Sequence, residues 1–211
     1  MSSDDEHPNS SPPDTVLKSY GVYNTISRIN FRIHAGGSTA PCIYYINNST
    51  FTPGSPDVQL RSGDSKDGPV IAFGKFHNLS SHVTLGLGDP NGVDKKSIVY
   101  EELHKESKIA HSEYVFETDV ARNGKRRKFI WRRTIGKGLF ANYACMDAAT
   151  GQLVAYFAKT GRKSMKKVGK LCVTAQTGQR FDELLLISWL AIREKENRNA
   201  WYAGGIISAS T

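Results

Sequence analysis

The sequence predicts a mainly β protein in which an antiparallel sheet wraps around one hydrophobic helix. Three observations predict this fold: a continuously apolar segment near the C-terminus, a long series of strand-like segments before it, and turn residues between those segments. The chain has 211 residues, of which 39% are hydrophobic, a composition typical of a soluble globular protein. A chain of this length buries enough surface to fold without a disulfide or a structural metal.

The apolar segment near the C-terminus predicts the helix. From Leu184 to Ile192 only Ser188 is polar, so a helix here is apolar on every side and must be enclosed by protein or lipid. Nine residues rise about 14 Å, too little for the roughly 20 residues that cross a bilayer, so we expect protein to enclose it. Asp182 and Glu183 place negative charge in the first turn, where the helix dipole favours it. A helix that fills the inside of the sheet leaves any ligand to bind outside.

The residues after this segment predict that the helix leaves the sheet. Arg193–Arg198 is strongly polar, so the rear half of the helix is expected to emerge into solvent. Gly204–Thr211 is expected to be a final strand or a loose end.

The strands are predicted from β-branched and aromatic residues that alternate with polar ones between turn residues. Asn123-Gly124 is the strongest hairpin signal, because a type I′ turn needs positive φ at both central residues. Tyr100–His111 fits either a short helix or a polar loop. The eleven predicted strands are Ile29–Ala35, Ile43–Asn47, Val58–Arg61, Val70–Phe76, His82–Leu87, Ile98–Glu102, Tyr114–Glu117, Lys128–Thr134, Ala141–Met146, Leu153–Lys159 and Gly169–Ala175.

Composition divides the chain into a tail and one domain. The first fifteen residues are rich in Ser, Asp and Pro, so we expect a disordered acidic tail over residues 1–20 and a single domain over 21–207. The acidic start does not resemble a signal peptide, and no segment is long and apolar enough to span a membrane. Cys42, Cys145 and Cys172 form an odd set without CxxC spacing. We expect reduced thiols in an intracellular protein.

Positive charge is concentrated in one part of the chain. The net charge is +8, and fifteen Lys or Arg residues lie between Val120 and Phe181 against one acid, Asp147. The candidate anion-binding residues are Arg122, Lys125, Arg126, Arg127, Lys128, Arg132, Arg133, Arg162, Lys163, Lys166 and Lys167, accompanied by Lys137, Lys159 and Lys170. If their two hairpins lie side by side, they form one basic face that suits phosphate groups or an anionic membrane. The alternative is that these charges only solubilise exposed strands and discourage edge pairing.

Nucleic acid is a weaker candidate partner for this basic segment. Phe129 and Trp131 alternate with cations, and exposed aromatic rings would stack on bases. In a closed barrel, however, these two rings point inward. Lys125–Lys128 also resembles a nuclear localisation signal. A cytoplasmic location is expected, with a peripheral membrane or nuclear location as alternatives.

No arrangement of residues predicts catalysis. The six histidines are scattered without the spacing of zinc ligands, and neither a phosphate-binding loop nor a G-x-S-x-G motif is present. We therefore expect a non-enzymatic protein without catalytic residues, metal or cofactor. Ser164, which follows Arg162 and Lys163, is a candidate phosphorylation site that would reduce the local positive charge.

The strand pattern ending in one apolar helix resembles the tubby-like superfamily, which includes tubby C-terminal domains, plant LURP-one-related proteins and phospholipid scramblases. The segments Arg132-Arg133-Thr134, Asn142-Tyr143, Gly151–Ala155 and Phe181–Trp189 are similar to small fungal proteins of that superfamily. The resemblance implies a closed antiparallel barrel of about twelve strands around a central C-terminal helix. It also implies binding of phosphoinositide headgroups by a basic surface; a protein-interaction or regulatory module with incidental charge, and nucleic-acid binding, are the alternatives.

Overall fold

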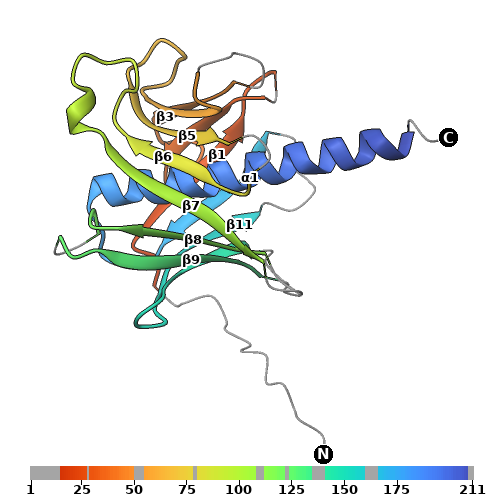
Figure 1. Ribbon diagram of the computed structural model, residues 1–211. Helices are drawn as coiled ribbons and strands as arrows, with labels where there is room; N and C mark the ends of the chain where they lie inside the picture. Colours follow the sequence, from red (N-terminus) through yellow and green to blue (C-terminus); the bar gives the residue numbers. More distant parts are fainter. Residues whose placement is uncertain are drawn as a thin grey trace, which may run out of the picture.

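The computed structural model describes residues 15–27, 29–49, 55–77, 80–107, 112–121, 124–134, 141–159 and 166–208. These residues form twelve strands, a short 3₁₀ helix and one long α-helix (Figure 1). The strands are β1 (Lys18–Asn24), β2 (Phe31–Ala35), β3 (Cys42–Asn48), β4 (Val58–Ser62), β5 (Val70–Phe76), β6 (Val83–Leu87), β7 (Val99–Ser107), β8 (Ser112–Thr118), β9 (Arg127–Arg133), β10 (Ala141–Asp147), β11 (Leu153–Lys159) and β12 (Lys167–Val173). The helices are η1 (Lys95–Ser97) and α1 (Gln179–Ser208).

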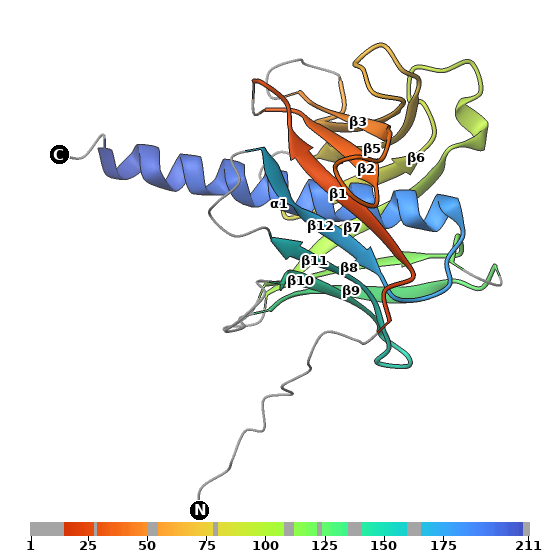
Figure 2. The ribbon, with the colours of Figure 1, turned by 180° about the vertical axis from the view of Figure 1, so that it is seen from behind.

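The strands form a closed barrel in which each pairs antiparallel with its neighbours in the chain. The barrel closes between its first and last strands, with Lys18 opposite Val173 and Tyr20 opposite Leu171 (Figure 2). The predicted mainly β fold, a closed antiparallel barrel of about twelve strands with one hydrophobic C-terminal helix, is confirmed. Closure leaves no exposed strand edge, so edge charges are not needed to prevent pairing with another chain.

Helix α1 fills the inside of the barrel. Every residue from Leu184 to Ile192 is at most 2% exposed, and the inward side chains of the strands surround this segment. The helix begins at one end of the barrel, which we call the start end, and leaves at the other, the exit end (Figures 1 and 2). The predicted enclosure of the apolar segment by protein is therefore confirmed.

Three contacts show how closely the sheet fits the helix. The Trp189 ring stacks on Phe157 with centroids 4.0 Å apart. Ser188, the polar residue of the segment, accepts a hydrogen bond of 3.0 Å from the indole Nε1 of Trp131, so neither polar group is buried without a partner. On the opposite wall, a Cβ placed on Gly74 would lie 3.3 Å from the Cβ of Ala191, so glycine lets the helix approach β5 closely.

Polar groups hold the first turn of α1 at the start end. The Asp182 carboxylate accepts hydrogen bonds from Lys18 Nζ and from the Tyr20 hydroxyl, both at 2.8 Å. Glu183 accepts from the Tyr44 hydroxyl at 3.3 Å. Burial and the charge of Glu183 raise the pKa of Tyr44 to about 12, so its hydroxyl stays protonated and able to donate at neutral pH. Through these contacts the helix start connects β1 and β3.

The rear half of α1 is tied to the rim of the exit end. Lys195 Nζ donates to the backbone oxygens of Ser80 and His82 at 2.7 and 3.0 Å. Arg198 pairs with Asp57 at 2.6 Å, and the Arg193 guanidinium lies 4.6 Å from the centre of the Phe31 ring. These cations were expected to be solvated, but the rim of the barrel supplies partners for them.

Two local predictions differ from the structure, and a third agrees with it. The region Gly204–Thr211 is not a strand as far as it is described, because α1 continues to Ser208. Tyr100–His111 is neither a helix nor a loop over its described part, which belongs to the nine-residue strand β7. The hairpin predicted at Asn123-Gly124 corresponds to the antiparallel pair β8 and β9; Gly124 has φ +61° in their connection, whereas Asn123 lies outside the described residues.

The buried helix generates a stability prediction. Leu186→Asp places a carboxylate at a position that is 0% exposed, which costs several kcal/mol when no partner is present. Because a domain is typically stable by only about 5–15 kcal/mol, we expect loss of the cooperative thermal transition measured by circular dichroism. Asn197→Asp, at an exposed position of the same helix, is the control and should unfold like the wild type. A stably folded Leu186→Asp protein would contradict the central placement of the helix.

Candidate functional site

The barrel separates the two groups of cations that the sequence suggested as one basic face. Residues 125–128 lie where β9 begins, at the start end, whereas Lys166 and Lys167 lie where β12 begins. Strand direction reverses at each step from β9 through β10 and β11 to β12, so β9 and β12 run in opposite directions. Their first residues therefore lie at opposite ends of the barrel (Figure 2). The two groups therefore do not converge. The candidates Arg122, Arg162 and Lys163, together with Lys137 and Ser164, lie outside the described residues.

At the start end, Arg126 forms ion pairs with carboxylates of the barrel. Its guanidinium pairs with Glu101 at 2.7 Å and lies 3.6 Å from Glu117. The Glu101 side chain is only 1% exposed, so Arg126 neutralises a buried charge. The hydrogen bond to Glu101 raises the pKa of Arg126 above its ordinary value.

Arg127 is held in the same way by Asp147, which ends β10. The Arg127 guanidinium pairs with one carboxylate oxygen of Asp147. The other oxygen accepts hydrogen bonds from the backbone N–H groups of Ala149 and Thr150 at 2.9 and 3.3 Å. The Asp147 side chain is 2% exposed, so this ion pair and the turn after β10 form one buried polar unit.

Two further predicted cations have carboxylate partners on neighbouring strands. Lys128 pairs with Glu106 of β7 at 3.2 Å, and Arg132 pairs with Glu113 of β8 at 2.8 Å. Lys125 and Arg133 are exposed and form no ion pair with the described residues. Most of the described members of the first basic group therefore balance acids of other strands instead of forming a free anion-binding surface.

The exit end contains lysines that differ from the first group in their ion pairing. Lys159, Lys166 and Lys170 form no ion pair with any acid among the described residues, and Lys167 lies 5.9 Å above the Tyr23 ring. Ala158 is opposite Lys170 and Lys159 is opposite Gly169 in the ladder between β11 and β12, so Lys159 and Lys170 lie at the same end of these strands but on opposite faces of the sheet. Burial and the positive charge of Lys170 lower the pKa of Lys167, as expected where like charges gather.

Two exposed isoleucines lie beside these lysines, in the connection between β1 and β2. The exposed fraction is 104% for Ile26 and 56% for Ile29. The connection is fixed at its base: Thr25 N donates to the oxygen of Asn30 at 3.0 Å, and Asn48 N donates to the Asn30 side chain at 2.9 Å. Hydrogen bonds thus hold the base of the connection that carries the two isoleucines.

A backbone hydrogen bond joins the isoleucine loop to the lysines. Asn24 N, just before the loop, donates to the backbone oxygen of Lys166 at 2.7 Å. We call the set formed by Ile26, Ile29, Lys159, Lys166, Lys167 and Lys170 the exit rim. Sequence reasoning identified all four lysines of the exit rim but missed the isoleucines, because Ile29 was assigned to a strand and Ile26 lies among polar residues.

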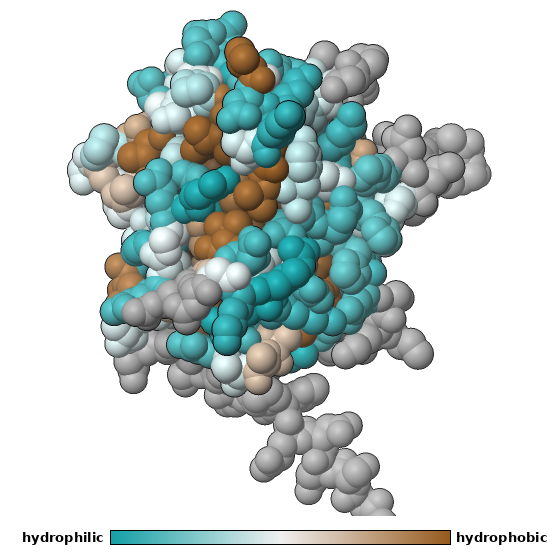
Figure 3. All heavy atoms as spheres, turned by 60° about the vertical axis from the view of Figure 1, so that its left-hand side comes forward, coloured by the Kyte–Doolittle hydropathy of each residue, from teal (hydrophilic) through white to brown (hydrophobic). Residues whose placement is uncertain are grey.

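The start end has a different surface. Figure 3 looks mainly at this end, and hydrophobic residues gather in the middle of the face with hydrophilic residues around them.

Phe129 and Trp131 are at most 2% exposed, so the expectation that they face the core is confirmed. Burial raises the pKa of the Cys145 thiol well above its ordinary value, which suits a core residue better than a nucleophile.

The described residues contain no group of three or more His, Cys, Asp or Glu side chains placed to hold a metal ion. Nor does any helix within them combine the length and hydrophobicity that crossing a bilayer requires. Comparison of the chain with protein-family models, curated proteins and solved structures finds no match.

The buried pair at the start end generates a second stability prediction. Asp147→Asn leaves Arg127 without a counter-charge, and we expect the free energy of unfolding in urea to fall by about 1–3 kcal/mol. Glu117→Gln removes an exposed carboxylate 3.6 Å from Arg126 and should cost about 0–1 kcal/mol. Equal losses in both variants would show that the Asp147 pair is no more important than a surface contact.

Proposed function

We propose that this protein is a non-enzymatic, tubby-like binding module that docks its exit rim onto an anionic phospholipid surface. The observation that carries the proposal is the pair of exposed isoleucines, on a connection that is hydrogen-bonded at its base, beside Lys159, Lys166 and Lys170, which pair with no acid among the described residues. Apolar side chains that enter the interface while cations meet the headgroups are typical of peripheral membrane binding. The filled lumen supports a site at an end of the barrel, because α1 occupies the interior.

The energies of these groups are sufficient for reversible binding. Each lysine near an anionic leaflet contributes about 1 kcal/mol. Full burial of an isoleucine side chain contributes about 1.5–3 kcal/mol, and the hydrogen-bonded base of the connection reduces the entropy lost on insertion. Neither term alone gives strong binding, so the exit rim is expected to need both.

A phosphoinositide headgroup is the proposed preferred lipid. Its clustered phosphates can contact several ammonium groups at once, and the resemblance of the sequence to tubby-like proteins supports the same choice. Two observations weigh against the alternatives. Phe129 and Trp131 are buried and cannot stack on nucleic-acid bases, and a protein-interaction module with incidental charge does not explain why lysines gather beside the exposed isoleucines.

The first test of the proposal concerns charge. The triple variant Lys159→Ser, Lys166→Ser and Lys170→Ser should lose sedimentation with phosphatidylcholine vesicles that contain phosphatidylserine or a phosphoinositide, with about tenfold weaker binding or more. The matched control is Lys66→Ser, Lys95→Ser and Lys96→Ser, which removes three exposed lysines near the other end of the barrel. Similar loss in both variants would show that only net charge matters and would contradict a defined site.

The second test concerns insertion of the loop. Ile26→Ser with Ile29→Ser should weaken vesicle binding by about tenfold or more, because the apolar contribution is lost while every charge remains. The loss should persist at high salt, which screens the lysines but not the apolar contact. Val93→Ser, at another fully exposed apolar position, is the control and should bind like the wild type. Absence of binding to all anionic vesicles would favour the protein-interaction module.

A further inference from the structure

The last turns of α1 extend beyond the barrel at the exit end. The helix continues to Ser208, and two opposite views show it projecting past the strands (Figures 1 and 2). Arg198 still pairs with Asp57 at the rim, whereas the next two residues, Asn199 and Ala200, are exposed. The helix backbone after Ala200 therefore lies outside the barrel.

The sequence of this projecting part has no polar helix face. Residues 200–207, which we call the helix tip, include no charged residue, and their polar side-chain groups are the Trp201 N–H and the Tyr202 hydroxyl. A helical segment without a polar face is stable where protein or lipid covers it. Gly204-Gly205 adds to this need, because glycine is a poor helix former in water. The barrel covers Leu184–Ile192 but does not extend to the helix tip.

The length of the helix tip suits the surface layer of a membrane. Eight residues of α-helix rise about 12 Å, whereas the hydrocarbon core of a bilayer is about 30 Å thick. The last carbonyl groups of an α-helix have no partner within the helix and favour hydrated surroundings. The helix tip therefore fits the boundary between headgroups and acyl chains, where apolar helix faces lie about 5–10 Å deep.

The charges around the root of the helix tip favour lipid over a second copy of the chain. Lys159, Lys166 and Lys170 lie at the same end of the barrel and pair with no acid in the part of the chain that the structure describes. Two copies that met through their helix tips would bring two such groups of lysines together, and like charges repel. An anionic leaflet offers the opposite charge next to an apolar layer.

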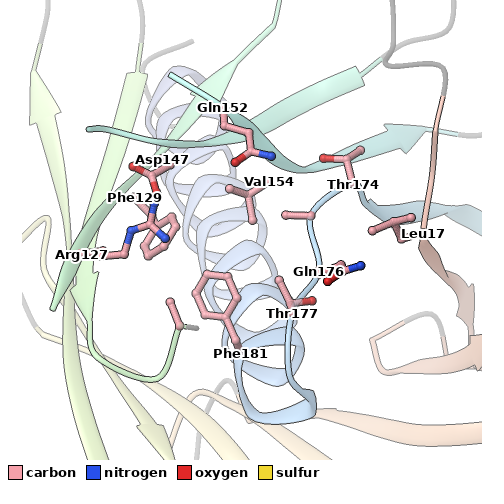
Figure 4. A pocket seen from close by; sticks show the side chains of 12 residues that line it. Leu17, Arg127, Phe129, Asp147, Gln152, Val154, Thr174, Gln176, Thr177 and Phe181 are labelled. Atoms are coloured by element: carbon pink, nitrogen blue, oxygen red, sulfur yellow. Dashed lines mark hydrogen bonds and ion pairs between the residues drawn. The ribbon is translucent and has the colours of Figure 1, made fainter. Parts of the chain in front are cut away.

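The start end presents a polar hollow instead. Its volume is about 390 Å³, and Arg127 and Gln152 border it (Figure 4). The Arg127 guanidinium is already paired with Asp147. Phe129 and Phe181 also line the hollow, but each is only 2% exposed, so an acyl chain finds little apolar surface there. The two ends of the barrel thus differ in what they offer to a membrane.

We propose that the helix tip inserts into the headgroup and upper acyl-chain layer of an anionic membrane. This inference rests on the proposed function and adds a second apolar element to the contact made by the exit rim. Trp201 and Tyr202, at the root of the tip, are residue types that favour the membrane interface. Ile206 and Ile207, further along the helix, meet the acyl chains while the helix end stays hydrated.

The test measures the depth of Trp201 by fluorescence quenching. The full chain is mixed with vesicles of phosphatidylserine and phosphatidylcholine that carry bromine either near the headgroup end or near the centre of the acyl chains. Trp131 and Trp189 are at most 1% exposed, so bromine-dependent quenching reports Trp201. We expect stronger quenching by bromine near the headgroup end, and loss of this quenching in Trp201→Phe.

The outcomes separate this inference from the proposed function. Sedimentation with the vesicles but no bromine-dependent quenching would overturn insertion of the helix tip and leave docking of the exit rim intact. Absence of sedimentation with every anionic vesicle would overturn both.

A pair of variants tests the contribution of the helix tip to affinity. Ile206→Ser with Ile207→Ser should weaken vesicle binding by about tenfold or more. The melting temperature should not change, because these positions lie beyond the barrel. Val16→Ser with Leu17→Ser is the matched control, since it changes two exposed apolar residues at the start end and should bind like the wild type.

Two results with the helix-tip variant would contradict the proposal. Undiminished vesicle binding would show that the tip does not contribute. A wild-type dimer in sedimentation velocity that Ile206→Ser with Ile207→Ser dissociates would show that a second copy, and not lipid, covers the helix tip.

Discussion

The structure depends on the burial of one apolar helical segment inside a closed sheet. Leu184–Ile192 has no polar face to turn toward water, so it is stable only where protein surrounds it. The strands have the reciprocal requirement, because their inward side chains need an apolar surface to pack on. Barrel and helix therefore form together, and the polar contact between Trp131 and Ser188 is satisfied within the core.

This packing confines function to the two ends of the barrel and to its outer surface. The lumen is occupied by side chains such as Trp189, so no ligand passes through it. The two ends then differ in chemistry. At the start end, acids and bases face each other across strands, as in Arg126–Glu101 and Arg127–Asp147. At the exit end, Lys159, Lys166 and Lys170 pair with no acid in the part of the chain that the structure describes, and Ile26 and Ile29 are exposed.

The strands were predictable wherever side chains alternate clearly, and less so elsewhere. Each of the eleven predicted strands corresponds to one of β2 to β12. Strand β1 was missed because Gly21 and polar residues interrupt its alternation; a Cβ on Gly21 would lie 2.9 Å from the Tyr23 ring, which explains the glycine. The last turns of α1 were missed because Gly204 and Gly205 are poor helix formers.

The sequence by itself determined the mainly β architecture, the central helix and the inward placement of Phe129 and Trp131, because periodicity and hydrophobicity are local properties of the chain. Only the tertiary structure decided which cations are neutralised. The partners of Arg126, Lys128 and Arg132 come from β7 and β8, where pairing of strands brings distant residues within a few ångströms. Charge counted along a segment cannot include such partners, since electrostatic energy depends on separation in space and not on separation in sequence.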